Sequence, residues 1–270
     1  MKKITFILLL FLVTNTMDAQ LGISFGAKTA FLSSKSFREF KNSYNTTLKD
    51  GVDGTNSMTN KMGGFMPQFG FGYAVDAVLF DILLIDIRFS NLYGATKCKW
   101  ENKEVRYFNF SQTSFFGGVG FVKKMDEYYV SLSVGLITGT DKIKSSWKYI
   151  DGTRSYGKDH IYSGVYDRTY LSYCVSLQVG HSLSDNMYAY GLFDLVFGSA
   201  FSDPQELSDD NILRGADANV YPAGLPTDVK AFNDYYNSGT GNLSSFEYVK
   251  ADFGGPRFEF GIRYLLFNNY

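Results

Sequence analysis

A histidine beside a carboxylate and a hydroxyl is the grouping in this chain that could activate a nucleophile or carry a proton. His160 follows Asp159 and stands three positions before Ser163, the one local grouping of this type. At the outer rim of a membrane such a group could serve a lipid-modifying enzyme. The surrounding segment is polar and no predicted strand fixes its geometry, so we interpret His160 as a solvated loop residue. We therefore expect no enzymatic activity.

The remaining candidates for chemistry are weaker. His181 flanks a predicted turn. Two glycine-rich stretches, residues 70–72 and 117–120, superficially resemble phosphate-binding loops, but no helix follows either, which favours close packing of strands. Five acidic residues crowd a late segment without the central glycine of a calcium loop, which leaves only a weak surface cation site as an alternative. These are Asp203, Glu206, Asp209, Asp210 and Asp217. We expect no metal ion and no cofactor.

The two cysteines are interpreted as separate thiols. Cys98 falls in a predicted polar loop, whereas Cys174 lies in the middle of a predicted strand. A chain in an oxidising compartment could pair them, but neither has neighbours at metal-ligand spacing.

Composition favours many alternating strands. The 270 residues are 17% aromatic, with 27 Gly and only 5 Pro. After the N-terminal region no stretch of 18 or more apolar residues occurs, which excludes apolar helical spans. A net charge of -1 gives no indication of a nucleic-acid partner.

The N-terminus has the layout of a secretory signal. Lys2 and Lys3 precede an apolar run over residues 4–13, which is too short to cross a bilayer as a helix. We predict a signal peptide over residues 1–19, cleaved near Ala19, and a single domain over residues 20–270.

The best-alternating segment is the last one. Its polar face carries Arg257, Glu259, Gly261 and Arg263, and its other face is apolar, a period of two that predicts a half-exposed β-strand. Seven earlier segments alternate in the same way. The eight predicted strands cover about residues 21–32, 64–79, 82–96, 105–122, 128–139, 169–181, 187–198 and 257–267. In the fourth, the aromatic residues change parity, and a bulge near Gln112 would reconcile the two halves.

The connections alternate between long and short, with long loops at about 33–63, 140–168 and 199–245. Within the last, residues 202–204 suggest a helix start, and Thr227 could cap a short helix reaching Tyr236. The loop aromatics could form a contact surface or pack on themselves; in loop four these include Tyr221, Phe232, Tyr235 and Tyr236. We predict an all-β fold: an eight-stranded antiparallel transmembrane β-barrel with long extracellular loops and short periplasmic turns.

A soluble barrel of lipocalin type has the same alternation turned inside out. Three observations favour the membrane barrel: no Gly-x-Trp occurs on the first strand, Gly and Ser crowd the polar faces, and the end motif described below is present. The polar faces would then fill a narrow lumen, where charges of both signs pair across strands and leave no conducting pore. The predicted lumen network is Lys28, Asp86, Arg88, Gln178, Asp194, Arg257, Glu259 and Arg263.

The end motif is Glu259-x-Gly261-x-x-Tyr264-x-Leu266. It resembles the C-terminal signal by which Gram-negative barrel-assembly machinery recognises outer-membrane proteins. The whole mature chain resembles the small eight-stranded outer-membrane barrels of Bacteroidota, the OmpA-like and PorT-like group. It departs from OmpA in having no peptidoglycan-binding domain after the barrel, which puts cell-wall anchoring in doubt.

The resemblance implies an outer-membrane location, contact with outer-membrane lipids and with the assembly machinery during insertion, and contact with other outer-membrane proteins. It suggests a non-enzymatic structural or accessory component of a larger secretion, uptake or assembly complex. The alternative is a surface barrel that binds an extracellular ligand through its long loops. A lipid-modifying enzyme is the third reading.

Overall fold

The structure is a computed structural model, and it describes residues 19–49, 56–155, 162, 164–198, 206–207, 225–238 and 246–266. The predicted signal peptide, apart from Ala19, lies outside these residues. So do His160 with its two neighbours and the predicted helix start at residues 202–204.

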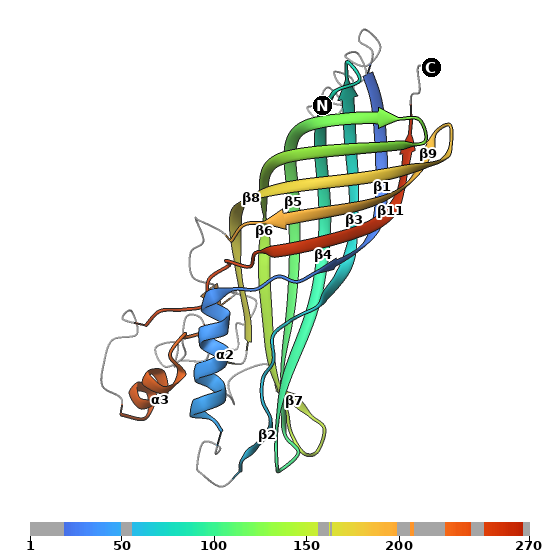
Figure 1. The fold of residues 1–270 in the computed structure, drawn as a ribbon. Coiled ribbons are helices and arrows are strands. Elements are labelled where there is room, and N and C mark those ends of the chain that lie inside the picture. Colours follow the sequence, from blue (N-terminus) through green and yellow to red (C-terminus); the bar gives the residue numbers. More distant parts are fainter. Residues whose placement is uncertain are drawn as a thin grey trace, which may run out of the picture.

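Eight long strands form a closed antiparallel ring (Figure 1). Each strand pairs with its neighbour in the chain, and the last pairs with the first, so no long edge remains for the bilayer to satisfy. The eight are β1 (Ala19–Ala30), β3 (Gln68–Leu79), β4 (Leu83–Trp100), β5 (Val105–Met125), β6 (Tyr128–Lys148), β8 (Gly164–Ser184), β9 (Met187–Val196) and β11 (Gly255–Leu265). The predicted eight-stranded barrel is confirmed.

Three short strands extend the sheet: β2 (Met58–Asn60), β7 (Arg154–Ser155) and β10 (Glu206–Leu207). The described residues also contain two helices, α2 (Lys35–Thr47) and α3 (Val229–Ser238). Neither of these helices is long and apolar enough to cross a membrane.

One end of the barrel is made of tight turns. Phe80 and Asp81, between β3 and β4, both have positive φ values, of 55° and 58°, as the two central residues of a type I′ turn require. Asp126, between β5 and β6, has a φ of 44°. The long connections all lie at the other end, which is hereafter called the cap end. This segregation is the predicted alternation of long and short connections.

The outward side chains form an apolar belt. It runs from Ile23 on β1 through Phe71 on β3 to Phe260 on β11, all at least 40% exposed. The inward positions at the same level include Ser, Gly and the charged residues, together with buried apolar side chains such as Leu84, Phe116 and Leu192. Because the exposed face is apolar and the charged side chains are buried inside, the barrel suits a bilayer and not water. The soluble alternative is thereby excluded.

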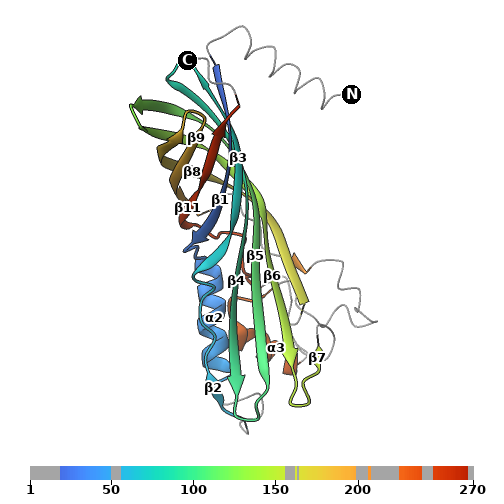
Figure 2. The same cartoon turned by 90° about the vertical axis from the view of Figure 1, so that its right-hand side faces the viewer.

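Several strands continue well past this belt. β5, β6 and β8 have 21 residues each, although about ten suffice to cross a membrane. In Figures 1 and 2, β4, β5 and β6 project beyond the barrel as a wall. The predicted loop 140–168 is therefore wrong at both ends, since β6 reaches Lys148 and β8 begins at Gly164. Cys98 likewise lies in β4 and not in a loop.

The predicted bulge at Gln112 is also wrong. β5 keeps one register with both neighbours through this position, where Gln112 faces Leu92 and Asp141. Phe108 and Phe110 share the inward parity of Gln112, while Phe115 points outward. The aromatic residues change parity because the inside of the wall is not a polar lumen: beyond the membrane it becomes an aromatic core.

The first long loop folds into α2, which the sequence analysis did not predict. Ser34 caps the helix by accepting a hydrogen bond from the backbone N–H of Phe37 at 2.9 Å. Phe37, Phe40 and Tyr44 are buried along one side of α2. α2 therefore packs against the inner face of the wall.

The predicted helix in the last long loop is present as α3. Its cap is Asp228, whose carboxylate accepts from the N–H of Ala231 at 3.0 Å, and not Thr227. The hydroxyl of Thr227 donates to the carbonyl of Glu247 instead. α3 is joined to α2 by a hydrogen bond from the N–H of Val229 to Ser43, at 2.8 Å.

A charge in the centre of the apolar belt should impair insertion. Ile262 lies midway along the outward face of β11 and is 44% exposed. We expect Ile262→Arg to destabilise the inserted barrel by about 2–4 kcal/mol, because arginine must enter the bilayer core. Heat-modifiable gel mobility after refolding into lipid vesicles measures this. Ile262→Ala is the control, and equal folded fractions in the two variants would contradict the assignment of this face to lipid.

Candidate functional site

The centre of the lumen holds an ion network built around Asp194 of β9. Its carboxylate accepts from Arg88 at 2.5 Å and lies 3.3 Å from the ammonium of Lys28. Lys28 also contacts Glu259 at 3.0 Å, and Arg88 contacts Asp86 at 3.1 Å. All five side chains are less than 10% exposed. The pairing is what makes this burial tolerable, since each unpaired charge would cost several kcal/mol.

A second layer lies nearer the tight turns. The guanidinium of Arg263 forms a two-pronged pair with Asp76, with one N–O distance of 3.0 Å, and lies 4.9 Å from the ring of Tyr129. Gly22 stands on the strand between them. A Cβ at Gly22 would come within 2.7 Å of Asp76 and 2.8 Å of Arg263, so a larger residue there would displace the two side chains from this position.

A third layer lies towards the cap end. Arg257 donates to Gln112 at 2.8 Å and to Ser114 at 3.2 Å, and Gln112 donates to Asp141 at 2.6 Å. Arg257 and Asp141 are both fully buried. The side-chain amide of Gln112 therefore bridges the guanidinium of Arg257 and the carboxylate of Asp141.

Five of the eight residues named for the lumen network meet around Asp194, whereas Arg263 lies in the second layer and Arg257 in the third. Gln178 is half-buried and makes none of these ion pairs; its side-chain amide donates a hydrogen bond to the hydroxyl of Tyr129 at 2.7 Å. The sequence analysis missed Asp76, Gln112 and Asp141. The sequence shows only that these residues point inward. Which inward residues meet depends on the register between strands, which the sequence does not show.

Beyond the third layer the interior becomes an aromatic core, hereafter called the cap core. It joins α2 and α3 to the inner face of the wall. In it, the ring of Phe40 lies 5.8 Å from that of Phe108 on β5, and Phe65 stacks on Phe37 at 4.3 Å. Its buried aromatic members are Phe37, Phe40, Tyr44, Phe65, Trp100, Phe108, Phe110, Trp147, Tyr162, Tyr166, Phe232 and Phe253.

One cation is enclosed in the cap core. Arg106 is 2% exposed, and its guanidinium lies 5.2–5.8 Å from the ring centres of Tyr44, Phe108, Trp147 and Tyr162. It also donates to the Tyr44 hydroxyl at 3.2 Å. Aromatic faces stabilise a desolvated cation. Burial raises the pKa of Tyr44, although Arg106 opposes the shift, so the phenol stays neutral and packs as part of the core.

The aromatic residues of the last long loop were predicted to form either a contact surface or a self-packed loop. Phe232 is fully buried against Tyr162 and Phe246, so it belongs to a self-packed loop and not to a contact surface. Tyr221 lies outside the described residues, as do the side chains of Tyr235 and Tyr236.

The other candidate groups are dispersed. Cys98 and Cys174 are separate, buried thiols, as predicted. His181, near the end of β8, stacks on Tyr128 at 4.7 Å. Among the described residues no group of three or more His, Cys, Asp or Glu could hold a metal ion. Of the five acids of the last loop, Glu206 alone is described, as part of β10.

The end motif divides between the two faces of β11. Glu259 points into the lumen towards Lys28, whereas Tyr264 and Leu266 are 49% and 42% exposed on the belt. Gly261 pairs with Gly26 of β1, where a Cβ would lie 2.1 Å from the carbonyl oxygen of Phe25. The glycine of the motif is therefore required where the first and last strands close the barrel.

No family model and no curated protein sequence matches the chain. Among solved structures, Ail, the attachment invasion locus protein of Yersinia pestis, in complex with the heparin analogue sucrose octasulfate, is similar over 92% of this chain and 99% of its own, at 9% identity and a TM-score of 0.41. The outer membrane protease OmpT from Escherichia coli is similar over 92% and 96%, at 8% identity and a TM-score of 0.30. These values are low, and the closed barrel follows from the strand pairing itself.

Proposed function

We propose that the protein is a non-enzymatic outer-membrane barrel that binds an anionic extracellular partner through its projecting wall. The observation that carries the proposal is the cap core. The long loops do not simply connect strands, since α2 and α3 share one buried core with the inner faces of β4, β5 and β6. A rigid platform held clear of the membrane is what a binding surface requires.

Lysines line the outer face of this wall, and the adjoining β8 places one acidic residue, Asp167, opposite Lys142. Beyond the belt, the outward positions include Lys97 and Lys99 on β4 and Lys142 and Lys144 on β6. Asp141, the one acidic residue of β4, β5 and β6 beyond the belt, points inward and is fully buried. Several lysines on one flat face attract an anionic partner and accelerate its association.

The lumen supports binding over transport. Three layers of paired charges and the cap core occupy the interior along its length. Eight strands enclose only enough space for side chains, so no conducting pore is proposed. The accessory role in a larger complex, expected first from the sequence, rests on the family resemblance, and no contact in the described residues favours it over binding.

Photo-crosslinking on intact cells, from a benzophenone side chain introduced into the protein, distinguishes the binding role from the accessory role. Asn109 is exposed on the wall and faces Lys144 across the strand pair, whereas Phe260 is 68% exposed on the belt. We expect covalent adducts from a benzophenone side chain at Asn109. We also expect these adducts to fall by roughly tenfold in Lys97→Glu/Lys144→Glu, because attraction becomes repulsion.

Lys123→Glu/Lys124→Glu is the charge-matched control, since both lysines are exposed at the tight-turn end of β5 and their change should leave the adducts unchanged. Protein adducts from Phe260 with none from Asn109 would favour the accessory role and contradict the proposal. An absence of adducts from both positions would contradict it as well.

A further inference from the structure

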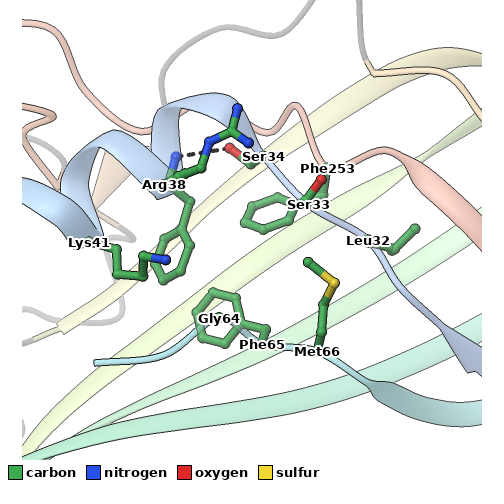
Figure 3. Close-up of a pocket in the computed structure, with 10 residues that line it drawn as sticks. Leu32, Ser33, Ser34, Arg38, Lys41, Gly64, Phe65, Met66 and Phe253 are labelled. Carbon is green, nitrogen blue, oxygen red and sulfur yellow. Dashed lines mark hydrogen bonds between the residues drawn. The ribbon is translucent and has the colours of Figure 1, made fainter. Parts of the chain in front are cut away.

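A small pocket lies where the cap meets the rim of the barrel (Figure 3). Its volume is about 150 Å³. Residues 32–34, which follow β1, form one side, and residues 64–66, which precede β3, form another. α2 covers the pocket with Phe37, Arg38 and Lys41, and Phe253 closes it. The walls are therefore mainly apolar, with two cations from one helix.

The two cations stand on successive turns of α2, three positions apart, and so share one side of the helix. Arg38 is exposed and Lys41 is half-buried. The ion pair recorded on α2 is that of Lys35 with Glu39, 3.8 Å apart and away from the pocket lining. Asp252, which precedes the lining residue Phe253, accepts hydrogen bonds from the hydroxyls of Ser34 and Ser36.

The pocket adjoins the lipid belt. Phe31, the residue before its first wall, is 43% exposed, and Phe69, three residues after its second wall, is 61% exposed. Met66 in the lining is itself 50% exposed. An apolar pocket with cations at its edge thus lies at the level where acyl chains end and head groups begin.

We propose that this pocket binds a phosphorylated lipid of the outer leaflet, with part of an acyl chain against the aromatic walls and the phosphate at Arg38 and Lys41. At about 30 Å³ per water-sized group, the volume holds about five such groups, which suits a chain segment and not a whole lipid. Guanidinium and ammonium groups are the donors that phosphate accepts most strongly. The site is separate from the basic wall, because it lies among α2 and the strand ends while the lysines occupy the outer face of β4 and β6.

The test measures lipid binding by the whole protein in detergent micelles, with monophosphoryl lipid A as the probe and native mass spectrometry as the readout. We expect Arg38→Ala/Lys41→Ala to weaken binding by roughly tenfold or more, through loss of charge-assisted hydrogen bonds. Lys35→Ala/Lys49→Ala removes the same charge from exposed positions around the same helix and should stay within about twofold of the parent. Dephosphorylated lipid A should bind the parent as weakly as the phosphorylated form binds the double variant.

A pocket-filling variant tests the acyl chain separately. Gly64 is part of the lining, and a Cβ on it would meet nothing closer than 4.0 Å, so Gly64→Leu adds bulk at the pocket wall without displacing a neighbour while both cations remain. We expect it to weaken binding as well. The proposal would be overturned if Gly64→Leu bound lipid A as tightly as the parent, or if the two double variants lost equal amounts of affinity. It would also be overturned if the parent bound phosphorylated and dephosphorylated lipid A equally well. Heat-modifiable mobility verifies that every variant is folded, and none of these outcomes bears on adducts at the wall.

Discussion

Asp194→Ala is expected to destabilise the barrel by about 3–5 kcal/mol, since it removes the carboxylate shared by two buried cations. Arg88 and Lys28 both reach Asp194, and neither can move into water, because each side chain is less than 10% exposed. Ser176 also loses its hydrogen bond to this carboxylate, which is 2.7 Å long. The variant breaks two buried ion pairs at once and leaves Arg88 with Asp86 and Lys28 with Glu259 as their remaining carboxylates. The lost hydrogen bonds to a charged group, at about 1.5–3 kcal/mol each, account for the expected cost.

Urea unfolding in lipid vesicles, followed by heat-modifiable mobility, measures the loss. Glu39→Ala is the control: it also removes a paired carboxylate, but the pair with Lys35 is exposed and spans 3.8 Å, so its loss should cost less than about 1 kcal/mol. Asp194→Asn keeps the shape and one acceptor and should fall between the two. If Asp194→Ala and Glu39→Ala unfold alike, the network does not stabilise the barrel.

The barrel itself could be predicted from the sequence because its signal is local. Each strand alternates within its own residues, and tight turns such as that at Phe80 and Asp81 separate alternate pairs. A membrane makes this pattern strict, since a polar side chain on the belt would face lipid. Strand number, order and the direction of each face followed from these signals.

The lumen pairs could be predicted only in part. Arg263 and Asp76 lie on β11 and β3, with β1 between them, and they meet across Gly22. Parity shows that both point inward, but their height in the barrel depends on two strand registers. No single segment carries that information, so the partners of the predicted charges could not be assigned.

The cap was missed for a different reason. The alternation of apolar and polar residues was interpreted as a lipid-facing and a lumen-facing side along the whole of each strand. Towards the cap end, however, the inward residues become apolar. Phe108 and Phe110 therefore looked like an interruption that required a bulge. α2 did have a signal in Ser34 and in Phe37, Phe40 and Tyr44, spaced three and four apart, but its polar surroundings led to its interpretation as a loop.

The cap and the barrel should unfold separately when the cap core is weakened. Phe40 is fully buried, with ring centres 5.5 Å from Tyr44, 5.8 Å from Phe108 and 6.2 Å from Tyr162. We expect Phe40→Ala to cost the cap about 3–5 kcal/mol through the cavity it leaves. The barrel should keep its stability, because its belt and ion layers do not touch Phe40.

The chain offers a built-in probe for this separation. Its two tryptophans, Trp100 and Trp147, both lie in the cap core with ring centres 4.6 Å apart, so their fluorescence reports on the cap, while heat-modifiable mobility reports on the barrel. In Phe40→Ala the fluorescence transition should move to lower urea by about 2 M, given a typical slope of roughly 2 kcal/mol per molar. The mobility transition should stay in place. Asn42→Ala, an exposed change on the same helix, should move neither. If both transitions shift together in Phe40→Ala, the cap and barrel form one cooperative unit, and the wall cannot be treated as a separately folded binding platform.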